Sequence, residues 1–200
     1  MVPPDLEIDV YDGSAWVGLV PFRVVGLTLP KAPAVQWLSH FPETNVRTYV
    51  VDRTGRRGVW FFSLDAARLA AVIGARLGYA LPYYWSKMAV RCDGRSAWYR
   101  SARRHGPKAA SLVEVDIREP LQAQSELEVF LTARFRLYAL RAGRLLRADV
   151  EHPQWPLHRA TVKRMEDTLV RAAGLAEPRG EPLVHFSPGV DVLVSRPIWG

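Results

Sequence analysis

The pattern of hydrophobic and polar positions along the chain predicts many short strands separated by turns. Apolar and polar residues alternate, and Gly, Pro, Asp or Asn stand at the breaks, as is typical of strands joined by tight turns. The predicted strands are residues 7–11, 15–20, 22–29, 45–51, 58–63, 83–92, 95–100, 111–117, 134–141, 144–150, 183–186 and 190–194. The segment 58–63 is apolar on both alternating faces, so we expect both faces to be buried.

Three segments show the helical recurrence of apolar residues instead. They are residues 65–77, 125–132 and 164–173. Asp65 stands near the start of the first helix, and Gly78 follows its end. Ser125 and Glu128 have the spacing of a capping box, in which two side chains satisfy free backbone N–H groups at a helix start.

A strand-rich chain with about three helices indicates an α+β protein. We expect a curved antiparallel sheet or closed barrel with the helices packed outside. The 200 residues show no linker, which predicts one domain spanning residues 1–200. A chain of this length can bury such a sheet and still enclose a cavity.

Composition narrows the class of protein without naming a function. Hydrophobic residues make up 48% and charged residues 24%, as in ordinary globular domains. No apolar run approaches the ~20 residues of a membrane-spanning helix, so no membrane partner is expected. The N-terminal residues are acidic and proline-rich rather than basic and then apolar, which favours a cytoplasmic location.

The chain is basic, with 27 Lys and Arg against 20 Asp and Glu. The densest group lies in the basic 91–108 region and comprises Arg91, Arg95, Arg100, Arg103, Arg104 and Lys108. Phosphate-rich partners bind such clusters when aromatic side chains lie among them, and Trp98 and Tyr99 do so here. A solvated arginine-rich surface explains the cluster equally simply, and we favour it over nucleic-acid binding.

Cysteine and histidine usage implies no metal and no cofactor. Cys92 is the single cysteine, which excludes an internal disulfide, and we expect a buried or half-buried thiol. His152 and His158 lack further residues that would complete a zinc pattern. No glycine-rich phosphate loop and no Gly-x-Ser-x-Gly turn occur, which removes the common nucleotidases, nicotinamide enzymes and serine hydrolases.

One predicted strand carries a polar stripe, because alternate side chains share a face. The stripe consists of Glu43, Asn45, Arg47 and Tyr49. From the pattern alone we favour a solvated outer face, with Val46 and Val50 facing the core. The alternative is that the stripe lines a pocket, in which Arg47 holds a carboxylate and Glu43 acts as an acid or a base.

Lys87 is the second candidate for chemistry. It shares strand parity with Tyr83, Trp85 and Ala89. A lysine desolvated among aromatic groups becomes a neutral amine that can form a Schiff base. The alternative, which the pattern favours, is a lysine whose stem covers apolar surface while its ammonium group reaches water.

Five segments in order along almost the whole chain carry a family resemblance. They are Asp-Gly-Ser-Ala-Trp-Val-Gly-Leu-Val-Pro-Phe (12–22), Phe-Pro-Glu-Thr-Asn-Val-Arg-Thr-Tyr-Val (41–50), Gly-Val-Trp-Phe-Phe-Ser-Leu-Asp-Ala (58–66), Leu-Pro-Tyr (81–83) and His-x-x-Trp-Pro-Leu (152–157). The set resembles the YqjF-like proteins, a bacterial family whose function is not characterised. The stretch from Phe62 to Ala89 is also similar, more distantly, to acetoacetate decarboxylase. That resemblance implies a β-barrel-like fold around a largely apolar cavity.

The decarboxylase pattern also implies site residues. Its first lysine of an adjacent pair forms a Schiff base, and its second lysine activates the first. Alignment on Lys87-Met-Ala places Ser86 at the first position and Lys87 at the second, and Glu43 matches an active-site glutamate. Because one lysine of the pair is absent, we do not expect acetoacetate decarboxylation itself.

The sequence thus predicts a protein that binds or transforms a small organic acid or carbonyl compound. Lys87 and Glu43 are the catalytic candidates. The ligand-binding candidates are Arg47, Asn45, Tyr49, Ser86, Tyr83 and Trp85. A non-catalytic binder of a small ligand and a nucleic-acid binder using the basic 91–108 region are the alternatives, and a homo-oligomer is left open.

Overall fold

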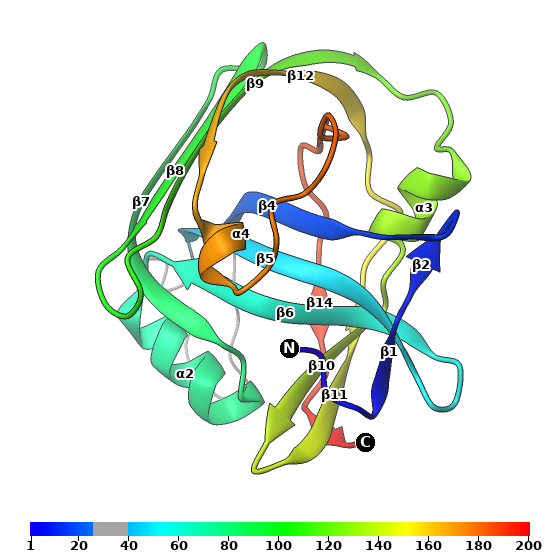
Figure 1. Ribbon diagram of the computed structural model, residues 1–200. Coiled ribbons are helices and arrows are strands. Elements are labelled where there is room, and N and C mark those ends of the chain that lie inside the picture. Colours follow the sequence, from blue (N-terminus) through cyan, green and yellow to red (C-terminus); the bar gives the residue numbers. More distant parts are fainter. Residues whose placement is uncertain (26–39) are drawn as a thin grey trace.

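The computed structural model describes residues 1–25 and 40–200, and Figure 1 shows their arrangement. The first strands are β1 (Leu6–Ile8), β2 (Val10–Tyr11), β3 (Ser14–Ala15), β4 (Val17–Val24), β5 (Phe41–Asp52), β6 (Arg57–Ala66), β7 (Tyr83–Cys92) and β8 (Ser96–Arg103). The later strands are β9 (Ala110–Pro120), β10 (Arg136–Arg141), β11 (Arg144–Glu151), β12 (His158–Asp167), β13 (His185–Phe186), β14 (Leu193–Val194) and β15 (Ile198–Trp199). The helices are α2 (Leu69–Tyr79), α3 (Glu126–Thr132) and α4 (Leu169–Ala172).

Thirteen of the strands in the described ranges form one mixed sheet. Its main path runs β13-β12-β9-β8-β7-β6-β10-β11-β14, and β5 joins β6 to the N-terminal strands β4 and β1. The pairs β6–β7 and β6–β10 are parallel, so the prediction of an antiparallel sheet is wrong at these two places. The path ends at β13 and β14 without returning, so the sheet is curved but not closed into a barrel.

The helices occupy different sides of the curved sheet. In Figure 1, α2 lies outside, below the ends of β6 and β7, whereas α4 lies between β12 and β5 within the curve. Leu169 and Val170 of α4 are buried and pack against Val46 of β5. The prediction that all helices pack outside is therefore wrong for α4. No helix in the described part of the chain is long and apolar enough to cross a membrane.

Two hairpin turns follow directly from their sequences. Asp12-Gly13 joins β2 to β3, and Ala142-Gly143 joins β10 to β11. Both central residues of each turn have positive φ, the backbone that suits the twist of two-residue hairpins. These turns fix the register of their strands and confirm the predicted hairpin at 134–150.

The predicted helix at 164–173 is mostly strand. Residues 158–167 pair with β9 as β12, and only residues 169–172 are helical. All residues of β12 are half-exposed or exposed, so no alternation of buried and exposed side chains marks this segment as a strand. Backbone hydrogen bonding to β9, rather than side-chain burial, specifies this strand.

The first predicted helix begins four residues later than its sequence indicates. Asp65 does not stand at its start, because it is the penultimate residue of β6 and its carboxylate is held by Arg103. The helix ends at Tyr79, one residue beyond Gly78, and Ala80 after it takes the left-handed backbone conformation. Cys92 is exposed at the end of β7, so the expected burial of its thiol is wrong. The helix α3 has the predicted capping box at Ser125 and Glu128.

Gly58 is required where β6 meets β10. A Cβ at this position would lie 2.6 Å from Cε2 of Tyr138 and 2.8 Å from the carbonyl oxygen of Arg136. Because that oxygen belongs to backbone, it cannot move away cheaply, and we expect Gly58→Ala to cost roughly 1–3 kcal/mol of folding free energy. Urea unfolding measures the loss, and Gly74→Ala in α2, where a Cβ meets nothing within 4 Å, is the control. Equal stability of the two variants would contradict this account.

Candidate functional site

The polar stripe of β5 is buried. Glu43, Asn45 and Tyr49 are 5%, 4% and 2% exposed, and Arg47 is half-buried. Val46 on the opposite face is fully buried as well. Neither face of β5 is solvated, because Phe130 packs in one cluster with Tyr49 and the α4 residues Leu169 and Val170 pack against Val46. The interpretation of the stripe as a solvated outer face is therefore wrong.

Glu43 and Tyr83 meet although 40 positions separate them in the chain. Glu43 pairs across β5–β6 with Ala66, and Ala66 pairs across the parallel β6–β7 contact with Trp85. These pairings bring the start of β7 beside Glu43. The Tyr83 hydroxyl donates a hydrogen bond of 3.0 Å to Oε2 of Glu43.

The Glu43 carboxyl is neutral at physiological pH. Burial raises its pKa to about 8; the Tyr83 hydrogen bond opposes this shift, and the negative charge of Asp65 reinforces it. Burial and the adjacent Glu43 also raise the pKa of Tyr83 well above its usual value. Both groups therefore hold protons at pH 7. A buried neutral carboxylic acid can donate a hydrogen bond to a carbonyl oxygen, which a carboxylate cannot.

Asn45 and Arg47 continue the stripe beside this pair. Within residues 1–25 and 40–200, Oδ1 of Asn45 and Nε of Arg47 are buried without a hydrogen-bond partner. Nη2 of Arg47 donates to the carbonyl oxygen of Leu131 at 3.3 Å, and its guanidinium lies 5.7 Å from the ring centre of Trp155. Because a buried unpaired polar atom costs free energy, Asn45 and Arg47 are suited to accept and donate bonds to a bound molecule.

Lys87 lies apart from this group. It shares the strand parity of Tyr83, but its side chain is exposed in the middle of β7. The burial that the Schiff-base prediction requires is not present at this position. Trp85 lies between the two, half-buried, with the Arg104 guanidinium 4.8 Å from its ring centre.

Ser86 points to the opposite face of β7, into a buried ionic cluster that the sequence analysis did not identify. Its hydroxyl donates to Oδ1 of Asp65 at 2.6 Å. Arg103 donates from Nε and Nη2 to the two oxygens of Asp65, at 2.9 and 3.1 Å. The Arg103 guanidinium also lies 3.7 Å from the ring centre of Tyr84. The antiparallel pairing of β7 with β8 sets Ser86 opposite Arg103.

His152 and His158 have separate partners. His152 contacts the carbonyl oxygens of Pro153 and Arg134, and His158 contacts that of Arg118. In the ranges that the structure describes, no three His, Cys, Asp or Glu side chains gather closely enough to hold a metal ion.

The basic 91–108 region is less uniform than its sequence indicates. Arg103 is buried in the ionic cluster, with 1% of its side chain exposed. Arg91 lies over the ring of Trp98, at 5.6 Å, and Arg104 lies over Trp85. These three arginines cover aromatic or acidic groups of the same chain, so they are not a free row of cations. These contacts do not test nucleic-acid binding by this region, which stays the less favoured alternative.

Comparison with known proteins places the chain in a protein family. Residues 1–191 match the family model DUF2071, described as an uncharacterized conserved protein. The uncharacterized protein YqjF of Bacillus subtilis is 36% identical over 195 residues, which cover 96% of this chain and 80% of that protein.

Two solved structures have a similar fold. Acetoacetate decarboxylase from Legionella pneumophila superposes with a TM-score of 0.72 at 13% identity, covering all of this chain and 78% of that one. The enduracididine biosynthesis enzyme MppR gives a TM-score of 0.56, also at 13% identity, covering 96% of this chain and 73% of that one. At these identities the similarity concerns the fold alone.

Proposed function

The chain belongs to the DUF2071 family of uncharacterized conserved proteins, and we propose that it binds or transforms a small carbonyl compound or organic acid beside Glu43. The observation that carries the proposal is the buried Glu43 carboxyl, which keeps its proton and receives the Tyr83 hydrogen bond. A fold similar to that of a decarboxylase acting on a keto acid supports the choice of ligand class.

Glu43 is the donor to the ligand in this proposal. Because the Tyr83 hydroxyl occupies Oε2, the other carboxyl oxygen of Glu43 is left to present its proton to a carbonyl oxygen. Such a bond polarises the carbonyl group, and full proton transfer would stabilise an enol. Tyr83 holds the carboxyl in place, and its phenol remains protonated through the same pH range.

Arg47 and Asn45 provide selectivity for an acid. The unpartnered Nε of Arg47 is suited to a ligand carboxylate, and Oδ1 of Asn45 to a hydroxyl or protonated group. Tyr49 and Trp85 supply aromatic walls at the two ends of the stripe. Because Lys87 is exposed, we assign the chemistry to Glu43 rather than to Lys87.

The test is calorimetric titration with acetoacetate, pyruvate and acetone as probes. We expect at least one probe to bind the wild-type protein, and Glu43→Leu to weaken that binding by about tenfold or more, the value of one lost hydrogen bond. Tyr83→Phe removes only the hydroxyl and should weaken binding by less. Tyr79→Phe is the matched control, because the Tyr79 hydroxyl donates to the Ser195 carbonyl oxygen and does not reach Glu43.

Borohydride treatment in the presence of the same probes separates this proposal from Schiff-base chemistry. We expect no covalent adduct in the intact mass of the wild-type protein. An adduct that disappears in Lys87→Ala would assign the chemistry to Lys87 and contradict the role of Glu43. Equal affinity of wild type and Glu43→Leu would contradict it as well.

A further inference from the structure

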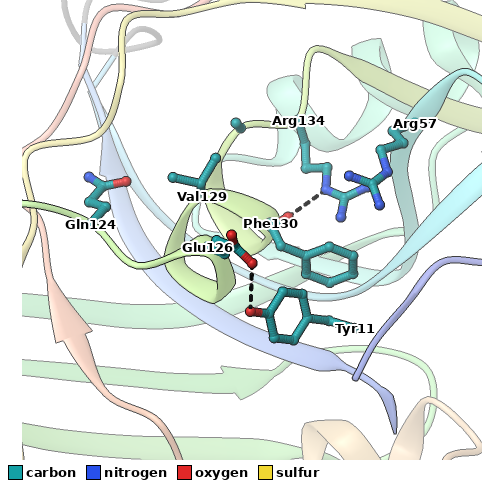
Figure 2. Close-up of a pocket in the computed structure, with 8 residues that line it drawn as sticks. Tyr11, Arg57, Gln124, Glu126, Val129, Phe130 and Arg134 are labelled. Atoms are coloured by element: carbon teal, nitrogen blue, oxygen red, sulfur yellow. Dashed lines mark hydrogen bonds between the residues drawn. The ribbon is translucent and has the colours of Figure 1, made fainter. Parts of the chain in front are cut away.

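A pocket lies along α3, and neither Glu43 nor Tyr83 lines it. Its volume is about 390 Å³, which falls in the range of small-molecule sites. Figure 2 shows its wall, in which Arg57 and Arg134 lie at one end, Gln124 lies at the opposite end, and Glu126 lies between them beside Tyr11. Arg57 and Arg134 supply positive charge and hydrogen-bond donors, whereas Gln124 and Glu126 supply acceptor oxygens.

Arg134 supplies a buried donor at the first end. Only 3% of its side chain is exposed. Its Nε donates to the carbonyl oxygen of Phe130 at 2.7 Å, and Nη1 donates to Asp9 at 2.5 Å. Nη2 is buried and has no partner in the described part of the chain. A buried guanidinium N–H without an acceptor is costly, and a bound anion would satisfy it.

Arg57 adds a second cation beside Arg134. Its Nε lies 3.0 Å from Oδ2 of Asp9, the same carboxylate that pairs with Arg134. Both guanidinium groups also lie over the ring of Phe130, at 5.4 and 4.2 Å. Two cations thus share one carboxylate, and one positive charge is left at this end of the pocket.

The other end offers acceptors. Nε2 of Gln124 donates to the carbonyl oxygen of Trp155, which leaves Oε1 of Gln124 buried without a partner in the described residues. Glu126 accepts a long hydrogen bond of 3.5 Å from Tyr11. Between the two ends the wall is apolar, formed by Val129 and Phe130.

We propose that this pocket binds a small organic monocarboxylate that carries a hydrogen-bond donor several bonds from its carboxylate. The carboxylate faces Arg57 and Arg134, the apolar middle contacts Phe130, and the donor reaches Gln124. A monoanion fits because one positive charge is left after Asp9 is counted. A phosphate dianion would exceed that charge.

The probe for this site is 4-hydroxybenzoate, a rigid molecule with all three features. Calorimetric titration compares it with benzoate, which lacks the donor, and with phenol, which lacks the carboxylate. We expect 4-hydroxybenzoate to bind more tightly than benzoate, and phenol not to bind. Arg57→Gln should weaken binding of both carboxylates by about tenfold, the effect of one charge-assisted hydrogen bond.

Gln124→Leu tests the other end of the pocket. It should reduce the affinity for 4-hydroxybenzoate to that for benzoate and leave benzoate binding unchanged. Arg53→Gln is the matched control, because Arg53 is an exposed arginine that pairs with Asp5 and does not line the pocket. Absence of binding by both carboxylates, or unchanged binding in Arg57→Gln, would overturn the proposal. Loss of 4-hydroxybenzoate binding in Tyr83→Phe with full binding in Arg57→Gln would also overturn it, by moving the ligand to the Glu43 site.

Discussion

Replacing Glu43 with glutamine is expected to stabilise the protein at pH 8 by up to about 5 kcal/mol. The folded-state pKa is about 8, against 4.5 for an unperturbed glutamate. Between these values the unfolded chain releases the proton while the folded chain retains it, so the wild-type protein loses stability as pH rises. Each pKa unit between the folded and unfolded values corresponds to roughly 1.4 kcal/mol of folding free energy. Below pH 4.5 both states are protonated and the loss is absent. Glutamine does not titrate, so the Glu43→Gln variant does not lose folding stability in this way as the pH rises.

Urea unfolding of wild type and Glu43→Gln at several pH values between 4.5 and 8 measures this difference. The contributions of all other groups cancel when one profile is subtracted from the other. Glu119→Gln is the control, because Glu119 is exposed and its replacement removes no buried carboxyl group. Parallel profiles for wild type and Glu43→Gln would show that Glu43 does not retain its proton.

The second large effect is expected for Arg103→Met. Asp65 and Arg103 have 0% and 1% of their side chains exposed, and two hydrogen bonds join them. Removing the arginine leaves a buried carboxylate with only the Ser86 hydroxyl as a side-chain partner among the described residues. Loss of one member of a buried pair typically costs about 3–5 kcal/mol. We expect a loss of that size in the free energy of unfolding.

A double-mutant cycle separates the pair from its members. Asp65→Leu combined with Arg103→Met removes both charges and should recover most of the loss, because no unpaired charge remains. Arg118→Met is the control, since its pairing with Asp116 is exposed and should change stability by roughly 0.5 kcal/mol or less. Additive losses from the two single variants would contradict the account of the pair.

Local sequence signals predicted the hairpins and one helix start. Turn pairs with positive φ at both positions set the β10–β11 register, and the Ser125 capping box sets the start of α3. The same local signals gave the wrong element where a contact between residues far apart in the chain determines the structure. Asp65 has the position of a helix-start residue, yet Arg103, 38 positions away, holds it in β6.

The candidate site could be predicted residue by residue but not as a whole. Glu43 and Tyr83 were both named from the sequence, and their contact depends on the parallel pairing of β6 with β7. Strand parity predicted Tyr83, Trp85 and Lys87 on one face. Parity does not show where along that face burial ends, and Lys87 lies beyond the buried part. The burial of both faces of β5 likewise depends on the strands and loops that cover it.

The most direct test of the central claim is an NMR titration of the side-chain carboxyl carbon of Glu43, assigned by its absence in Glu43→Gln. We expect a titration midpoint near pH 8, and a further upward shift when a bound carbonyl probe accepts a hydrogen bond from the Glu43 proton. A midpoint near the ordinary glutamate value, or a midpoint that no probe of the panel alters, would contradict the claim that Glu43 is the neutral acid of a ligand site.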